Sequence, residues 1–312
     1  MPRTTSYRHA LLLVAATACW GCGTVLSKQV LDRGVAPLTL LAIELAASSL
    51  LLLVGTLVLG LRPTWSANLG RLAALGVLNP GFAYALGLLG LVTIDASMSV
   101  LLWATEPILI MLLAVLILRE RVAAATIVAV GVALIGVLLV LYRPGASGDA
   151  IGIALTVGAV TACAFYTVLT RRLLLDDSSL AVVLVQQVAA LAFALVIAGI
   201  AWATGTADLG LPSDSATWAL AAASGMVYYG LAFWFLIGGL RGVPASIAGS
   251  FFPLIPVFGL AAGYLVGDRL TDRQGLGATL VVVATAAATA YHLTRQPTRS
   301  HSHRFVDRRE HG

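Results

Sequence analysis

Charged residues are scarce in this sequence. They make up 11% of its 312 residues, whereas 59% are hydrophobic, and this balance excludes a water-soluble globular protein. A helix needs about 20 apolar residues to cross a bilayer. We therefore predict an all-α membrane protein with ten transmembrane helices, at residues 9–28, 37–61, 69–91, 95–118, 123–142, 149–172, 180–203, 216–239, 244–267 and 272–293.

Catalytic motifs and metal ligands are missing as well. The sequence has no nucleophile elbow, zinc-protease motif, P-loop or dinucleotide-binding glycine pattern. Of its five histidines, His9 and His292 lie at the ends of predicted spans and the other three lie in the tail. Cys19, Cys22 and Cys163 lie inside spans, where a reactive thiol is not expected, and we interpret them as packing residues. These absences predict a protein that is not an enzyme and has no cofactor or metal.

Short segments of the first half recur in the second. Thr24-Val25-Leu26 recurs as Thr167-Val168-Leu169, and at that offset Glu44 falls on Gln187. A second block matches without a gap, pairing Gly76, Ala83, Gly90, Leu91, Ala96, Ser97 and Pro107 with Gly225, Ala232, Gly239, Leu240, Ala245, Ser246 and Pro256. Each half holds five predicted spans, an odd number, so the second half must enter the bilayer from the opposite side. We predict two inverted five-helix repeats, 1–146 and 147–293.

The distribution of basic residues predicts the orientation. With the N-terminus in the cytoplasm, the inner loops and tails hold fourteen lysines and arginines and the outer loops hold five. The positive-inside rule then places both termini in the cytoplasm. The net charge of +5 follows from this asymmetry, so we expect no nucleic-acid partner. We expect the basic tail, 294–312, to be cytoplasmic and disordered.

Two carboxylates lie within predicted spans. An acid near the middle of a membrane helix costs about 2.5–3.5 kcal/mol on insertion scales and usually faces a cavity or a partner. Glu106 lies midway along the fourth span and is a candidate for binding substrate or a proton, although a structural hydrogen bond is the alternative. Glu44 lies nearer the outer end of the second span and is a second candidate, unless it pairs with Lys28.

Prolines occur at similar depths in both halves. Pro107 and Pro256 occupy matching positions, Pro253 precedes the latter, and Pro80 interrupts the third span. A proline inside a helix leaves a carbonyl unpaired, and matched interruptions in two repeats indicate a binding site. We therefore predict that these prolines break helices and take part in gating. A kink that serves only packing is the alternative.

Aromatic and amide side chains add a possible lining to this site. Trp20, Trp103 and Tyr229 lie within spans and not at the interfacial belt where such residues are usually enriched. Asn79 and Gln187 supply polar groups in the third and seventh spans. Each aromatic residue taken alone is explained by packing, but together they favour a pocket for a small amphipathic molecule. Small-residue faces, such as Gly259 with Gly263 and Gly267, pack helices closely and could also serve a homodimer.

The order of these motifs resembles the EamA-type members of the drug/metabolite transporter superfamily. The resemblance rests on Trp20-Gly21 followed by Lys28 and on Ala96-Ser97, Pro107 and Glu120, repeated as Ala245-Ser246, Pro256 and Asp268, with Thr271, Gly275 and Gly277 opening the last helix. It implies a multi-pass protein of the bacterial inner membrane that moves small organic solutes, often as an exporter. Glu44 departs from the arginine that family members commonly carry nearby.

The residues and the resemblance together predict a secondary transporter. We expect an exporter of a small cationic or zwitterionic metabolite that works by alternating access. Glu106 would be the charge or proton partner, with Trp20, Trp103, Asn79, Gln187 and Tyr229 around it. An uncoupled facilitator or exchanger is the near alternative, and a membrane assembly partner without transport is the other.

Overall fold

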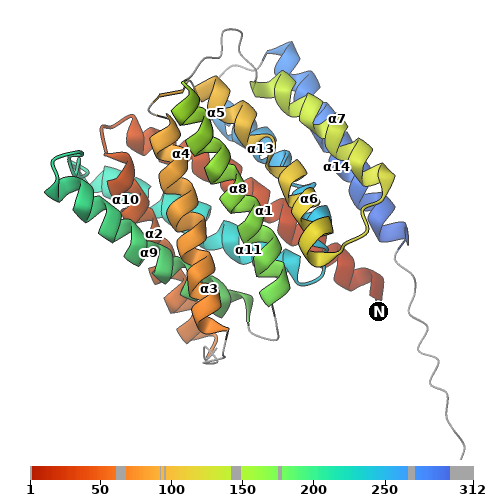
Figure 1. Ribbon diagram of the computed structural model, residues 1–312, viewed down its shortest axis with the longest axis horizontal. Coiled ribbons are helices and arrows are strands. Elements are labelled where there is room, and N and C mark those ends of the chain that lie inside the picture. Colours follow the sequence, from red (N-terminus) through yellow and green to blue (C-terminus); the bar gives the residue numbers. More distant parts are fainter. Residues whose placement is uncertain are drawn as a thin grey trace, which may run out of the picture.

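The computed structural model describes residues 2–60, 68–91, 93–94, 96–141, 149–174, 178–265 and 271–295. Within these residues the chain is a bundle of helices joined by turns (Figure 1). Its elements are α1 (Pro2–Leu31), α2 (Pro37–Val58), α3 (Leu69–Gly76), η1 (Val77–Phe82), α4 (Ala83–Leu91), α5 (Ala96–Trp103), α6 (Glu106–Leu118), α7 (Ala124–Leu141), α8 (Ala150–Leu173), α9 (Ser179–Ala203), α10 (Ser215–Gly225), η2 (Met226–Leu231), α11 (Ala232–Leu240), α12 (Ala245–Gly249), α13 (Leu254–Leu265) and α14 (Asp272–Arg295), where η denotes a π-helix.

These described elements make ten membrane spans. Eight segments are long and apolar enough to cross a membrane as continuous helices. The third span, 69–91, contains non-helical backbone at Asn79 (φ −151°, ψ 122°), and the fourth is divided between α5 and α6. Both remain apolar and complete two sets of five spans. The predicted all-α fold of ten spans in two inverted repeats is therefore confirmed. The predicted tail, 294–312, lies outside the described residues beyond Arg295.

Local sequence sets several helix ends. Pro37 begins α2, where its missing N–H is not needed. Asp149 caps α8 by accepting the N–H of Gly152 (2.7 Å). Ser178 and Asp214 cap α9 and α10 in the same way. These polar caps satisfy N–H groups that the helix leaves free and keep the connecting loops outside the apolar layer.

The outer surface of the bundle is apolar. Leu57, Val58, Leu116, Val128 and Ile151 each expose 65–78% of their area. A surface of this kind suits lipid, because a bilayer favours apolar side chains and helices that satisfy their own backbone hydrogen bonds. The chain is a multi-pass membrane protein.

Packing between helices reveals the relationship of the repeats. In the first repeat α1 packs on α11 and α13 of the second, and in the second repeat α8 packs on α4 and α6 of the first. Likewise α2 contacts α10 while α9 contacts α3. The helices α2 and α9 contact each other, as do α7 and α14. Each contact is therefore repeated with the halves exchanged, which is the pattern of a pseudo-twofold axis between two inverted repeats.

Two glycines allow helices of opposite repeats to approach each other closely. A Cβ at Gly76 would lie 2.1 Å from the backbone oxygen of Gln186, and a Cβ at Gly225 would lie 2.3 Å from that of Glu44. The third span of each repeat therefore touches the backbone of the other repeat's second span.

The small-residue faces considered for a homodimer are occupied within the chain. Ala129 and Ala133 are buried on α7, which packs against α14. Gly259 lies against Gly21 of α1. A homodimer remains a prediction, and these faces do not supply its interface.

Candidate functional site

A cavity of ≈ 470 Å³ lies between the two repeats. Its volume is that of a small-molecule pocket, for which about 300–1,000 Å³ is usual. Residues from both interrupted fourth spans, both π-helical regions and both first helices line it. At one end the lining reaches Leu141, which ends α7, and Gln274 in the first turn of α14.

The lining obeys the repeat symmetry. Thr24 and Thr167, which lie in the matching tripeptides, both face the cavity. At the offset that relates Pro107 to Pro256, the lining residues Asn79, Tyr84, Trp103 and Glu106 correspond to Tyr228, Phe233, Phe252 and Ile255, which also line it. The cavity therefore lies on the pseudo-twofold axis. One pair breaks the symmetry in charge, because Glu106 faces Ile255 across the axis.

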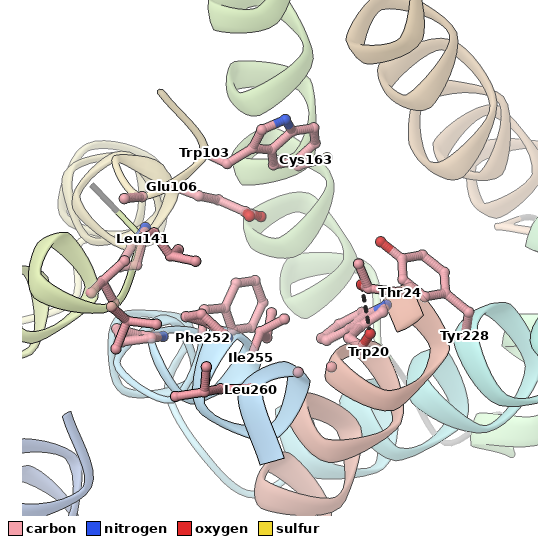
Figure 2. A pocket seen from close by; sticks show the side chains of 18 of the residues that line it. Trp20, Thr24, Trp103, Glu106, Leu141, Cys163, Tyr228, Phe252, Ile255 and Leu260 are labelled. Atoms are coloured by element: carbon pink, nitrogen blue, oxygen red, sulfur yellow. Dashed lines mark hydrogen bonds between the residues drawn. The ribbon is translucent and has the colours of Figure 1, made fainter. Parts of the chain in front are cut away.

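Among the described residues that line the cavity, Glu106 is the one carboxylate, and none is a lysine, arginine or histidine. Figure 2 shows its carboxyl group pointing into the space between Trp103, Cys163 and Phe252. Within the described part of the chain it has neither a hydrogen-bond nor an ion-pair partner. A carboxylate in an apolar cavity without a partner is costly, so a bound cation or a proton would stabilise it.

The helix interruptions hold Glu106 in place. Helix α5 ends at Trp103 and α6 begins at Glu106, with Pro107 as its second residue. In the second repeat α12 ends at Gly249 and α13 begins at Leu254. Pro253 lies in the turn between them and Pro256 in the first turn of α13. The prolines thus lie at breaks in both fourth spans, and Pro107, Pro253 and Pro256 all line the cavity.

The third spans carry a second pair of irregularities. η1 and η2 occupy the same place in their repeats, although η1 contains Pro80 and η2 has no proline. Asn79 of η1 and Tyr228 of η2 both line the cavity. The π-helical turn is therefore a property of the fold, and Pro80 is not its only cause. Pro80 itself does not line the cavity.

Aromatic rings surround much of the space. Trp20 packs edge-on against Phe233 and Phe252, with ring centroids 5.4 Å apart in each pair. Tyr84 lies 6.2 Å from Trp103, and its hydroxyl is 3.2 Å from that of Tyr228. Such faces can attract a cation.

Two polar atoms in this wall are unsatisfied. Trp20 Nε1 and Asn79 Oδ1 are buried and have no hydrogen-bond partner in the described structure. Both residues line the cavity. Because neither atom is exposed, a bound molecule reaches them only if these side chains move.

Three residues predicted around the substrate lie elsewhere. Gln187 is fully buried between α2 and α9, where its Nε2 donates to the backbone oxygen of Tyr229 (3.2 Å) and its Oε1 accepts from Ser48 (3.3 Å). The Tyr229 ring packs behind the lining, against Tyr84 and Phe233. Glu44 does not reach the cavity either. These residues support the wall and do not contact its interior.

The hydrogen-bond partners of Glu44 are not the Lys28 partner that the sequence left open as an alternative. Lys28 pairs with Asp32 at 2.9 Å and not with Glu44, which instead accepts hydrogen bonds from Ser27 and Ser224, each at 2.6 Å. Its structural counterpart is Gln186 and not Gln187. Gln186 packs against Gly76 as Glu44 packs against Gly225. The one-residue difference arises because Ser27 and Glu44 are 17 positions apart, whereas Thr170 and Gln186 are 16 positions apart.

Sequence reasoning missed several lining residues. Thr24 and Thr167 were visible as a repeated tripeptide, and Tyr84 and Phe233 as matched positions in the third spans. Cys163, interpreted as a packing residue, lines the cavity with Gln274. The repeat alignment alone could have identified the symmetric pairs, whereas nothing in the sequence marks Gln274.

Comparison with known proteins places this fold in a family. A protein of Archaeoglobus fulgidus described as an uncharacterized transporter is 27% identical over 164 residues, which are 53% of this chain and 58% of the relative; the match thus spans little more than half of the relative's length. A crystal structure of another protein superposes with a TM-score of 0.76 at 19% identity, covering 91% of this chain and 96% of that one, which shows a shared fold.

The family assignment covers both repeats. The model of the EamA-like transporter family matches residues 8–142 and again residues 150–290, one match for each five-span half. The chain belongs to the EamA-like transporter family.

Proposed function

We propose that this protein is a secondary transporter that binds a small organic cation or zwitterion at Glu106 and exports it. The observation that carries the proposal is the carboxylate of Glu106, which has no hydrogen-bond or ion-pair partner among the described residues and lies in a cavity whose described lining contains no basic residue. A cationic group on the substrate would neutralise this charge. An anionic substrate would find no basic side chain among the described residues of the lining.

The remaining lining favours a substrate with an apolar or aromatic part. Trp20, Trp103, Tyr84 and Phe252 offer ring faces and edges, and cation–π contacts contribute about 0.5–2 kcal/mol when partly desolvated. Trp20 Nε1 and Asn79 Oδ1, which are buried, would add one donor and one acceptor if substrate binding turned these side chains toward the cavity. An amine or quaternary ammonium compound of amino-acid or small-drug size fits this combination.

The interruptions support alternating access. The cavity lies beside the breaks in both fourth spans and beside both π-helices, where small backbone rotations can move one half-helix against the other. Inverted repeats commonly exchange their two packings around a midplane site. With the termini in the bacterial cytoplasm, as the basic loops predict, the end of the lining at Leu141 and Gln274 lies toward the outer side of the membrane.

Binding of matched aromatic dyes tests the charge preference. Ethidium, a cation, and fluorescein, an anion, are titrated against the purified protein in detergent, with binding followed by fluorescence polarisation. We expect ethidium to bind and fluorescein not to bind. Glu106→Gln should weaken ethidium binding at least about tenfold, equivalent to about 1.4 kcal/mol. The control Asp208→Asn, in the exposed loop after α9, should bind as the parent does.

Transport of ethidium is then measured with the same protein in liposomes. Ethidium loaded on one side should leave by counterflow in the parent and not in Glu106→Gln. Ethidium affinity that is equal in the parent and in Glu106→Gln would remove the carboxylate from the site. Preference for fluorescein would overturn the cation assignment. Exchange without accumulation under any ion gradient would instead indicate the uncoupled facilitator.

A further inference from the structure

Three oxygen atoms meet at a buried point outside the cavity. Ser27 on α1 and Ser224 on α10 each lie 2.6 Å from Oε1 of Glu44 on α2, and the two serine hydroxyls lie 2.8 Å from each other. Glu44 exposes 3% of its area and Ser224 none. We call these residues the Glu44 triad. All three separations are those of O–H···O hydrogen bonds.

The protonation state of Glu44 decides how many hydrogens the Glu44 triad contains. Three hydrogen bonds in a closed triangle need three hydrogens, and the two serines supply one each. With an ionised Glu44, both serines donate to the carboxylate, and the short Ser27–Ser224 contact then contains no hydrogen. With a protonated Glu44, the carboxyl donates to one serine, that serine donates to the other, and the second donates back. The protonated form gives each of the three contacts a hydrogen of its own, whereas the ionised form satisfies them only if one serine hydrogen is shared between two acceptors.

We propose that Glu44 binds a proton in this conformation and that the Glu44 triad is the transporter's proton-coupling site, separate from the cation site at Glu106. The coupling role of Glu44 rests on the proposed transport function. The presence of a proton on Glu44 does not depend on that function. The proton comes from water on one side of the membrane and returns to water when the triad opens.

Among the described residues, no cation contacts Glu44 to hold it ionised. From η2 the phenol groups of Tyr228 and Tyr229 face it, and α9 contributes the amides Gln186 and Gln187 to the packing against α2. Helix α10 carries no ionisable side chain from Ser215 to Gly225. On α1, Lys28 is exposed and paired with Asp32.

The Glu44 triad is connected to the cavity by two short helical steps. Ser27 lies three residues from Thr24, and Ser224 lies four residues from Tyr228; both Thr24 and Tyr228 line the cavity. Residues at these spacings are neighbours on a helix face. A movement of α1 or η2 on binding substrate therefore displaces one edge of the triad.

The same contact joins the two repeats. Glu44 and Ser27 belong to the first repeat and Ser224 to the second, and the backbone of Glu44 packs against Gly225. Loss of the proton would leave a carboxylate buried in this interface. Because burying an unpaired charge is costly, deprotonation favours a state in which α10 separates from α1 and α2 and admits water.

The opposite half has an equivalent polar cluster that cannot titrate. Gln186 accepts from Tyr166 (2.9 Å) and donates to Thr170 (3.5 Å), and it packs against Gly76. Thr170 occupies the first span of its repeat, as Ser27 does. Protonation therefore biases one of the two symmetric interfaces, which is what a gradient-driven transporter requires.

Infrared spectroscopy detects the proton without any substrate. The purified protein in liposomes is titrated from acidic to alkaline buffer while the C=O band of protonated carboxyl groups is followed. We expect a component at neutral pH that is absent in Glu44→Gln and retained in Glu120→Gln. Ser27→Ala should shift that component, and Ser27→Thr should preserve it because the hydroxyl remains.

Two infrared outcomes would overturn the proposal. The first is a neutral-pH spectrum of Glu44→Gln that matches the parent spectrum in this region. The second is a change in the Glu44 signal when sodium chloride replaces choline chloride, which would assign the site to a metal cation. The serine variants give the same decision if Glu44→Gln does not purify as a monodisperse protein.

A transport measurement then separates the proton site from the cation site. In liposomes, Glu44→Gln should exchange ethidium across the membrane but lose its accumulation driven by a pH gradient, whereas Glu106→Gln should lose both. Accumulation that persists in Glu44→Gln would overturn the coupling role. If the parent protein moves no ethidium, the proposed function fails, and the infrared result still decides whether Glu44 holds a proton.

Discussion

Ser246 donates both its backbone N–H (3.0 Å) and its hydroxyl (2.6 Å) to Oε2 of Glu120. Oε1 of the same carboxylate accepts the N–H of Ala245 (2.9 Å). Glu120 follows α6 in the first repeat, and Ala245 begins α12 in the second. The contact therefore joins the fourth spans of the two repeats, at the end of α6 remote from the interruption at Glu106. The corresponding Asp268 lies outside the described residues.

Removal of the Glu120 charge should loosen this junction. In Glu120→Gln one oxygen becomes an amide NH₂ group that cannot accept, so at least one of the three contacts is lost and the remaining ones no longer go to a charged group. Hydrogen bonds to a charged group contribute about 1.5–3 kcal/mol, and we expect destabilisation of about that size. Hydrogen exchange at residues 245–249 should accelerate and the melting temperature should fall. Asp272→Asn, at an exposed position in the first turn of α14, is the control; equal exchange in the two variants would contradict the prediction.

The two close glycine contacts should be intolerant of a methyl group. At Gly76 and Gly225 an added Cβ would lie 2.1 and 2.3 Å from backbone oxygens, and a backbone cannot move aside as a side chain can. Gly76→Ala and Gly225→Ala should therefore reduce the yield of folded protein sharply, by separating the second and third spans of opposite repeats. Size-exclusion chromatography and thermal melting measure the effect.

Two helical glycines with open surroundings provide the control. Nothing lies within 4 Å of a Cβ placed at Gly131 of α7 or Gly199 of α9. Alanine there should be neutral or stabilise the protein by up to about 1 kcal/mol, because glycine is the poorer helix former. If all four variants melt alike, the close approach seen at Gly76 and Gly225 does not limit stability.

The fold could be predicted because the physics of the bilayer is simple. Ten apolar stretches and a repeat with an odd number of spans leave few alternatives to an inverted pair of five-helix bundles. Pro107 and Pro256 line the cavity, where each interrupts its helix because a proline cannot complete the hydrogen-bonding; a substrate site at this depth remains a prediction. Glu106 could be singled out from the sequence because an acid inside a membrane helix is costly and usually faces a cavity or a partner.

Side-chain direction could not be predicted in the same way. Glu44, Gln187 and Tyr229 lie at suitable depths, yet they point into helix interfaces and not into the cavity. Their placement depends on how a helix is rotated against its neighbours, and apolar residues on every side of a membrane helix give little sign of that rotation. The irregular η2, without a proline, shows that tertiary packing also sets helix breaks.

The hydroxyls of Tyr84 and Tyr228 should be energetically coupled. They lie 3.2 Å apart and connect α4 of the first repeat to η2 of the second. In a double-mutant cycle with phenylalanine at either or both positions, we expect a coupling energy of about 0.5–1.5 kcal/mol, the usual net value of one hydrogen bond. Thermal or denaturant unfolding of the four proteins gives this value. Strict additivity would show that the two phenols act separately.

The helix caps should make stability sensitive to acid. The N–H of Gly152 (2.7 Å) and the Thr93 hydroxyl (2.9 Å) both donate to Asp149 and hold its pKa below the ordinary value. Because folding lowers this pKa, the ionised Asp149 cap stabilises the folded protein at neutral pH. This stabilisation is lost as the pH falls from about 3.9, the pKa of an aspartate in the unfolded chain, through the lower pKa in the folded protein. Asp149→Asn should therefore lower the melting temperature at neutral pH, and the difference from the parent should vanish in strong acid.

Asp208→Asn, on an exposed loop, is the control and should melt with the parent at every pH. A constant difference between Asp149→Asn and the parent at every pH would disprove the electrostatic origin of the cap.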